Sequence, residues 1–185
     1  MSVTKILAQV HKELGTVLKH VDESPIEKLL DAALAAEKIY LAGQGRSGLM
    51  ARAFAMRLMH LGLTSFVAGE TVTPAFMKDD LMIACSGSGE TKITVHLAES
   101  SKECGGQLAV VTANPKSTLA KMADFVILLR CGEFGADRQW TRSIQFGRAL
   151  FEQSSLLLFD AMVLRLAARL GKKAQDVLLR HTNLE

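Results

Sequence analysis

Short runs of consecutive apolar residues alternate along this chain with longer segments in which apolar residues recur every three or four positions. The short runs predict buried strands at 38–42, 65–68, 80–85, 107–112 and 125–129. The longer segments predict helices at 2–21, 25–37, 49–61, 91–104, 148–170 and 172–180, with a helical turn at 117–122. Alternating strands and helices indicate a parallel sheet covered on both faces. We therefore expect an α/β fold, a three-layer α/β/α sandwich of the flavodoxin-like or Rossmann-like kind on a five-stranded parallel sheet.

The 185 residues suit a single domain. We expect N-terminal helices over 2–37, an α/β core over 38–130 and C-terminal helices over 146–180. Ser24, Pro25 and Glu27 predict a capping box at the start of the second helix, and Gly171 is a typical helix terminator. Residues 131–145 are polar and irregular, and no regular element is predicted there.

Composition and charge narrow the function classes. The 22 Lys and Arg residues face 19 Asp and Glu residues, and aromatics are only 5%, so a nucleic-acid partner is not expected. No apolar stretch is long enough to span a membrane, and the first residues lack a secretory signal. The cysteines are odd in number and widely spaced, and no His or Cys pair has a metal-binding spacing. We expect a cytoplasmic protein with no metal and no cofactor.

Two glycine-rich turns follow predicted strands, where an open parallel sheet binds its ligands. The first is 43–48, Gly-Gln-Gly-Arg-Ser-Gly, and the second is 86–91, Ser-Gly-Ser-Gly-Glu-Thr. Glycine lets the backbone approach a ligand, the next helix supplies free N–H groups, and the hydroxyls add hydrogen bonds. Both turns together favour an anionic small molecule, most simply a phosphate ester.

Two other interpretations of these turns stay open on the residues alone. Residues 43–48 also match the G-x-G-x-x-G dinucleotide fingerprint, and Glu70 lies at the spacing of a ribose-binding acid. A dinucleotide site has no need of the second, hydroxyl-rich turn, which suits a compact phosphate better. Alternatively, the glycines and serines serve only the geometry of strand-to-helix connections.

The two turns in their strand–turn–helix setting resemble those of the sugar isomerase (SIS) domain family. Further stretches resemble its 6-phospho-3-hexuloisomerase branch: 54–60 (FAMRLMH), 69–74 (GETVTP), 114–120 (NPKSTLA), 150–153 (LFEQ) and 180–185 (RHTNLE). This resemblance covers nearly the whole chain from about residue 25. It departs at 146–149, Phe-Gly-Arg-Ala, where the family carries a Pro-Met-Gly-Thr-like run, and Arg148 there adds a positive charge.

The resemblance implies interconversion of D-arabino-hex-3-ulose 6-phosphate and D-fructose 6-phosphate through an enediol, without metal or organic cofactor. It implies a homotetramer with sites near subunit interfaces, and a functional link to 3-hexulose-6-phosphate synthase. Its implied acid–base residues are Glu152 and His181, with His181 able to complete a neighbour's pocket. Its implied phosphate-binding residues are Gly45, Arg46, Ser47, Ser86, Gly87, Ser88 and Thr91.

Alternatives within this fold are a phosphoheptose or arabinose 5-phosphate isomerase, or a sugar-phosphate-binding module without chemistry. Several of these residues can also be interpreted as structural rather than catalytic or binding residues. Glu152 fits a dipole-compensating acid in a first helical turn, and His181 fits an exposed terminal residue. His60 fits a helix-end complement, and Cys85 a small apolar filler. Glu70 and Glu90 serve equally well as hydroxyl ligands or as turn stabilisers.

Overall fold

The computed structural model describes residues 1–132 and 142–183 and has at its centre a sheet whose neighbouring strands all pair in parallel. Its five strands are β1 (Ile39–Ala42), β2 (Ser65–Val67), β3 (Leu81–Cys85), β4 (Gln107–Thr112) and β5 (Phe125–Leu128). Each strand lies within a predicted apolar run. The predicted α/β fold with a five-stranded parallel sheet is confirmed.

The strand order is β2-β1-β3-β4-β5, which is the flavodoxin-like order. The chain first builds outward from β1 to β2 and then crosses to the other side of β1 with β3. Such a reversal creates a crevice beyond the carboxyl ends of the two strands, where open α/β sheets bind ligands. Ala42 of β1 pairs with Ala84 of β3, so both strands end at the same level. The two glycine-rich turns follow these two strands directly and therefore meet at the crevice.

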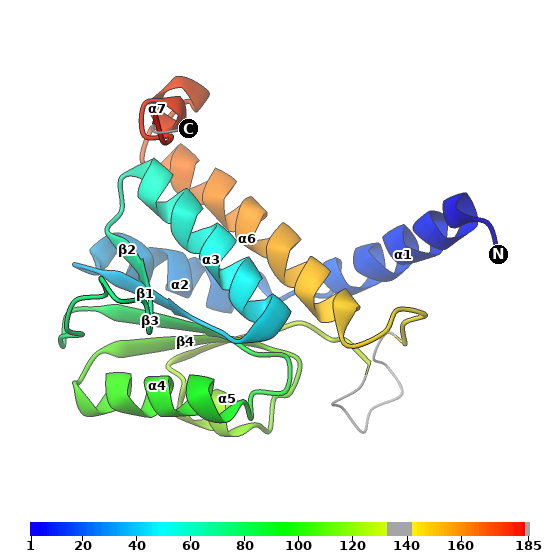
Figure 1. The fold of residues 1–185 in the computed structure, drawn as a ribbon, viewed down its shortest axis with the longest axis horizontal. Helices are drawn as coiled ribbons and strands as arrows, with labels where there is room; N and C mark the ends of the chain where they lie inside the picture. The colour runs from blue at the N-terminus through cyan, green and yellow to red at the C-terminus, as the bar shows by residue number, and fades with distance from the viewer. Residues whose placement is uncertain (133–141, 184–185) are drawn as a thin grey trace.

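Helices cover both faces of the sheet (Figure 1). The helices are α1 (Val3–Leu18), α2 (Glu23–Ala35), α3 (Gly45–Leu61), α4 (Lys92–Glu103), α5 (Thr118–Met122), α6 (Ala149–Arg169) and α7 (Ala174–Leu178). Helices α4 and α5 lie on one face, and α2, α3 and α6 on the other. Helix α1 extends away from the sheet as an arm, and α7 packs at the far end of α3.

Strand β1 shows why the sheet must be covered on both sides. Ile39 and Leu41 belong to the apolar cluster under α2, α3 and α6. Tyr40 and Ala42, which point the other way, belong to the cluster under α4 and α5. All four residues are at most 2% exposed, as a strand between two helical layers requires. Among the described residues, no helix is both long enough and apolar enough to cross a membrane.

The predicted start of the second helix is wrong. Asp22, not Ser24, caps α2, and its carboxylate accepts a hydrogen bond of 3.0 Å from the Ser24 backbone N–H. The helix therefore begins at Glu23, and Pro25 falls inside the first turn, where a missing N–H costs no hydrogen bond. Asp and Ser are comparable capping residues, so their order along the chain does not decide between them.

The predicted start of the third helix is also wrong, in a way that matters for the site. Helix α3 begins at Gly45 rather than Leu49, so Arg46 and Ser47 lie in its first turn. Their backbone N–H groups are therefore among those that a helix leaves without intrahelical partners. The C-terminal helix is shorter than predicted and spans Ala174–Leu178. The Gly171 terminator of α6 is confirmed, with a φ of 64° just beyond the helix.

Candidate active site

The first glycine-rich turn is tightly folded against its own start. A Cβ atom on Gly48 would lie 2.7 Å from the Gly43 carbonyl oxygen, closer than real Cβ contacts. The Gly48 N–H donates to the Gln44 carbonyl oxygen at 3.1 Å, which closes the first turn of α3. The close approach of Gly43 and Gly48 therefore sets how α3 leaves β1, and it directs the helix N-terminus at the crevice.

The second turn is organised by its own hydroxyl groups. The Ser86 Oγ lies 3.1 Å from the Thr91 Oγ1 and accepts a hydrogen bond of 3.2 Å from the Gly89 N–H. Gly89 has a φ of 65°, and a Cβ there would lie 2.1 Å from the Ser117 Oγ. Thr91 is the N-cap residue of α4. The turn thus holds Ser86 and Thr91 side by side at a second helix N-terminus.

Glu152 lies in the first turn of α6 and is only 7% exposed. The Arg46 Nε lies 3.0 Å from its Oε2 oxygen, although this oxygen accepts no hydrogen bond from the described residues. Burial raises the pKa of the Glu152 carboxyl, and the positive charges of Arg46 and then Arg148 oppose this increase. The net pKa lies above the usual range. Glu152 is therefore a largely buried carboxylate that is ion-paired with Arg46 and has an increased affinity for protons.

One cavity of about 320 Å³ brings most of the predicted site residues together. Its lining includes Gly45, Arg46, Ser47, Ser86, Gly87, Thr91 and Glu152. It also includes Gln44, Cys85, Gly147 and Arg148. Helices α3, α4 and α6 all begin at this cavity, so three positive dipole ends face it. Such an arrangement favours an anion. Among the described residues, no group of three or more His, Cys, Asp or Glu residues could hold a metal ion.

Ser88 and His181 are the two predicted site residues that do not line this cavity. The Ser88 Oγ accepts a hydrogen bond of 3.2 Å from the Glu90 N–H. His181 follows α7 and is exposed, and its ring stacks on that of His60 with 5.4 Å between the ring centroids. His60 lies in the last turn of α3, whereas Arg46 lies in its first turn. Within one subunit, His181 and Glu152 are therefore at opposite ends of α3 (Figure 1).

Glu90 and Glu70 differ in what they bind. The Glu90 carboxylate accepts hydrogen bonds of 2.8 Å from both the backbone N–H and the side-chain hydroxyl of Thr118, and these bonds lower its pKa. It joins the second turn to the start of α5, as expected of a turn stabiliser. Glu70 pairs with Arg52 at the surface.

Cys85 and His60 both lie in buried surroundings. Cys85 is fully buried, which raises its pKa to about 12, as expected of an apolar filler. His60 is 3% exposed and is the basic residue of the last turn of α3, where it was expected to complement the helix end.

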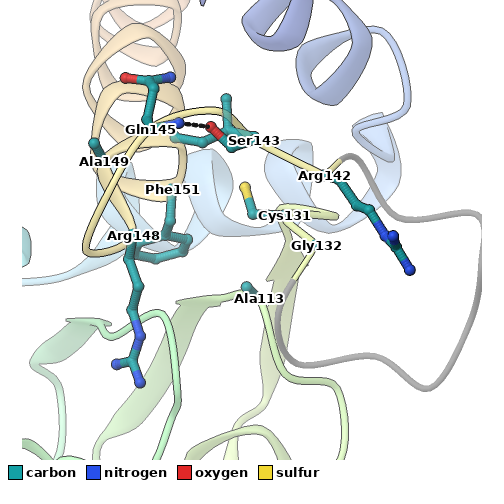
Figure 2. A pocket seen from close by; sticks show the side chains of 10 residues that line it. Ala113, Cys131, Gly132, Arg142, Ser143, Gln145, Arg148, Ala149 and Phe151 are labelled. Atoms are coloured by element: carbon teal, nitrogen blue, oxygen red, sulfur yellow. Dashed lines mark hydrogen bonds between the residues drawn. The ribbon is translucent and has the colours of Figure 1, made fainter.

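A second cavity, of about 270 Å³, lies beside the segment that leads into α6 (Figure 2). Its lining includes Cys131, Arg142, Ser143 and Phe151, together with Arg148. Arg148 thus belongs to the walls of both cavities. The sequence indicated an extra positive charge near the ligand at Arg148, although Arg148 was not among the predicted phosphate-binding or catalytic residues. Part of the stretch predicted to be irregular, 133–141, lies outside the described residues.

Comparison with known proteins decides the family. The SIS domain model matches residues 34–134, which include both glycine-rich turns. The chain belongs to the SIS domain family. Its SIS relatives include the Bacillus subtilis protein named 3-hexulose-6-phosphate isomerase, which is 38% identical over 185 residues and is matched along all of both chains. The Mycobacterium gastri protein of the same name is 37% identical over 183 residues, which cover 99% of this chain and 92% of that one.

A solved structure shows the same similarity in three dimensions. The crystal structure of a Methanococcus jannaschii protein superposes with a TM-score of 0.85 at 31% identity and covers 98% of this chain and 99% of that one. That structure is described as inferring a molecular function of 3-hexulose-6-phosphate isomerase. The similarity in sequence and in fold thus extends over the whole SIS chain, including the segments before and after the matched domain.

Proposed function

We propose that this protein is a 3-hexulose-6-phosphate isomerase, which interconverts D-arabino-hex-3-ulose 6-phosphate and D-fructose 6-phosphate. The observation that carries the proposal is the largely buried Glu152 side chain, which lines the same cavity as the two glycine-rich turns. The full-length similarity to isomerases of this name supports the same reaction. An anion site and a base in one cavity are what a ketose phosphate isomerase requires.

The substrate phosphate binds at the two turns. The hydroxyls of Ser47, Ser86 and Thr91 and the N-termini of α3 and α4 supply neutral donors and a positive field. Ser88 acts within its turn through the bond from the Glu90 N–H. Binding the phosphate at the turns directs the other end of the sugar towards Glu152.

Glu152 is the base. It removes the proton from C2 of the 3-ketose, and the electrons of that C–H bond form a 2,3-enediolate. The same carboxyl then returns a proton to C3, while the proton of the C2 hydroxyl moves to the C3 oxygen, so that the carbonyl is at C2. One carboxylate can serve both carbons because they share a bond. Burial raises the pKa of Glu152 in the direction of neutral pH. A general base is most efficient when its pKa lies near the operating pH.

Arg46 has two roles in this scheme. Without substrate its guanidinium faces Glu152 and lowers the pKa of that carboxyl. Its place in the first turn of α3, next to Ser47, also puts it within the phosphate-binding turn. A phosphate dianion competes with Glu152 for this guanidinium, because Arg binds phosphate and carboxylate in the same way.

His181 acts in a neighbouring subunit's cavity. A histidine titrates near neutral pH and can carry the proton between the C2 and C3 oxygens. The substrate itself needs no ring-opening acid, because the O6 that would close a five-membered ring carries the phosphate. The exposed position of His181 at the end of α3 remote from Glu152 supports a role outside its own subunit. A homotetramer with shared sites, as the family resemblance implies, provides that arrangement.

A coupled assay tests the proposed function. Purified 3-hexulose-6-phosphate synthase, formaldehyde and ribulose 5-phosphate generate the unstable hexulose phosphate in place, and fructose 6-phosphate formation is followed. The proposal expects fructose 6-phosphate only when this protein is present. Formation of no fructose 6-phosphate, with turnover of arabinose 5-phosphate or sedoheptulose 7-phosphate instead, would replace it by one of the other SIS isomerase activities.

A further inference from the structure

The segment that leads into α6 has an unusual backbone. Arg148 has a φ of 73°, and it is the one described non-glycine residue with a positive φ. It follows Gly147, whose φ is 61°. The Arg148 carbonyl oxygen accepts the first hydrogen bonds of α6, from the N–H groups of Phe151 at 2.9 Å and Glu152 at 3.3 Å. Side chains rarely adopt this conformation, and such outliers concentrate at functional sites.

This backbone conformation places the Arg148 side chain at the cavity. Figure 2 shows the guanidinium extending away from the start of α6 towards the ends of the strands. Arg148 lines the cavity that contains Glu152, which is one helical turn further along. Its positive charge acts on the Glu152 carboxyl and opposes the effect of burial on that group. Arg148 is therefore a cation beside the base, on the α6 side of the cavity.

A residue of α1 holds the segment that leads into α6 through hydrogen bonds. Glu13 of α1 is 3% exposed, and its carboxylate accepts hydrogen bonds of 2.6 Å from the Ser143 Oγ and 3.2 Å from the Ile144 N–H. Gln9 adds a third, of 3.0 Å, from its side-chain amide. Burial raises the pKa of Glu13, but these bonds outweigh it and lower the pKa overall. A buried carboxylate thus anchors the residues just before Gly147 and Arg148.

We propose that Arg148 is a catalytic residue that binds the reacting oxygens of the substrate, and that Glu13 is its positioning residue. The proposal rests on the isomerase function above and deepens it. In the reaction the C2 and C3 oxygens gain negative charge as the enediolate forms next to Glu152. A fixed guanidinium beside the base stabilises that charge, because a preorganised donor in a partly buried site needs no rearrangement as the charge develops.

The position of Arg148 favours the reacting oxygens over the phosphate. The proposed phosphate ligands lie elsewhere. The hydroxyls of Ser86 and Thr91 belong to the turn after β3, and the hydroxyl of Ser47 belongs to the start of α3. Arg148 instead belongs to the start of α6, together with the base. A sugar phosphate that spans the cavity from the turns to Glu152 therefore presents its reacting carbons to Arg148 and its phosphate to the turns.

Binding of two non-reacting ligands tests the role of Arg148. 4-Phosphoerythronohydroxamate carries anionic oxygens like those of the 2,3-enediolate, whereas erythritol 4-phosphate carries the same phosphate and only hydroxyls. We expect Arg148→Met to weaken the hydroxamate at least about 10-fold by calorimetry, as for loss of a charged hydrogen bond, and erythritol 4-phosphate less than about 2-fold. Equal weakening of both ligands, or of neither, would overturn the proposal. Arg142→Met is the matched control, because Arg142 lines only the second cavity.

A double mutant tests the positioning role of Glu13. We expect Glu13→Ala to weaken the hydroxamate and to lower kcat, and to leave the binding of erythritol 4-phosphate unchanged, which also shows that the site is folded. Glu13→Gln, which keeps one acceptor oxygen, should recover part of the loss. In an Arg148→Met background, Glu13→Ala should have little further effect on hydroxamate binding. Full additivity would refute the positioning role.

Failure of this inference is distinguishable from failure of the proposed function. Wild-type protein that forms no fructose 6-phosphate in the coupled assay would contradict the isomerase function, and the inference would fall with it. Wild-type protein that is active, with Arg148→Met equally active and equally able to bind the hydroxamate, would contradict only the role of Arg148.

Discussion

The two ends of α3 differ in charge, burial and surroundings. At its first turn, Arg46 faces the buried Glu152 in a cavity where three helices begin. At its last turn, the buried His60 stacks on the exposed His181 beside α7. The 17 residues of α3 separate these ends by about 25 Å. The two residues proposed as the acid–base pair therefore cannot meet within one subunit.

We infer from this difference that the two ends of α3 have separate roles. The first-turn end has the proposed base, the proposed phosphate-binding turns and three helix N-termini, so we assign the chemistry to it. The last-turn end has an aromatic stack that fixes the tail, and it presents His181 outward. His60 cannot substitute as the proton carrier in its own subunit, because burial, Arg57 and His181 all lower its pKa and it lies at the same remote end.

The largest effect is expected at the first-turn end. Glu152→Gln keeps the shape of the side chain but removes the base, and we expect kcat to fall about 1,000-fold in the coupled assay. Binding of erythritol 4-phosphate should persist, because the turns are unchanged. A Glu152→Gln variant as active as the wild type would show that Glu152 is not the base. The first turn of α3 would then have no assigned catalytic group.

A smaller loss is expected at the last-turn end. His181→Ala should lower kcat about 100-fold, because a proton carrier is lost while the base remains. Mixed oligomers of Glu152→Gln and His181→Ala subunits should regain activity, since some cavities then combine an intact Glu152 with an intact His181. Mixtures no more active than the separate variants would refute the shared site.

The smallest effect is expected on the pH profile. The Arg46 charge lowers the pKa of Glu152, so Arg46→Met should raise that pKa further. The base is active when deprotonated, so the acid limb of the kcat/KM profile should move to higher pH, and only modestly because the Arg46 side chain is half exposed. Arg46→Lys, which keeps the charge, should leave the limb in place. A move to lower pH would contradict the ion-pair assignment.

The fold and much of the site could be predicted from local patterns. Runs such as 108–111 are wholly apolar because both faces of the sheet are covered, and glycine-rich turns such as 86–91 mark the ends of such strands. Ser86 and Thr91 were therefore predictable as neighbours. The start of α3 was not, because Gly45 is a poor helix former and begins the helix with a left-handed φ of 56°.

Contacts between distant residues could not be predicted in the same way. Arg46 meets Glu152, and Glu13 meets Ser143, 130 positions further along the chain, only because α1, α3 and α6 pack together. No periodicity or motif in the sequence encodes such pairs. The family resemblance named Glu152 as a catalytic residue but gave no indication of the raised pKa, which arises from burial under packed helices.

Proton exchange at fructose 6-phosphate in D₂O, followed by ¹H NMR, tests directly whether Glu152 forms a 2,3-enediolate. Formation of the 2,3-enediolate by Glu152 predicts that the protein replaces the proton at C3 with deuterium and leaves both protons at C1 in place. Glu152→Gln should show neither exchange. Exchange at C1 instead of C3, or exchange at C3 at the wild-type rate in Glu152→Gln, would contradict the account.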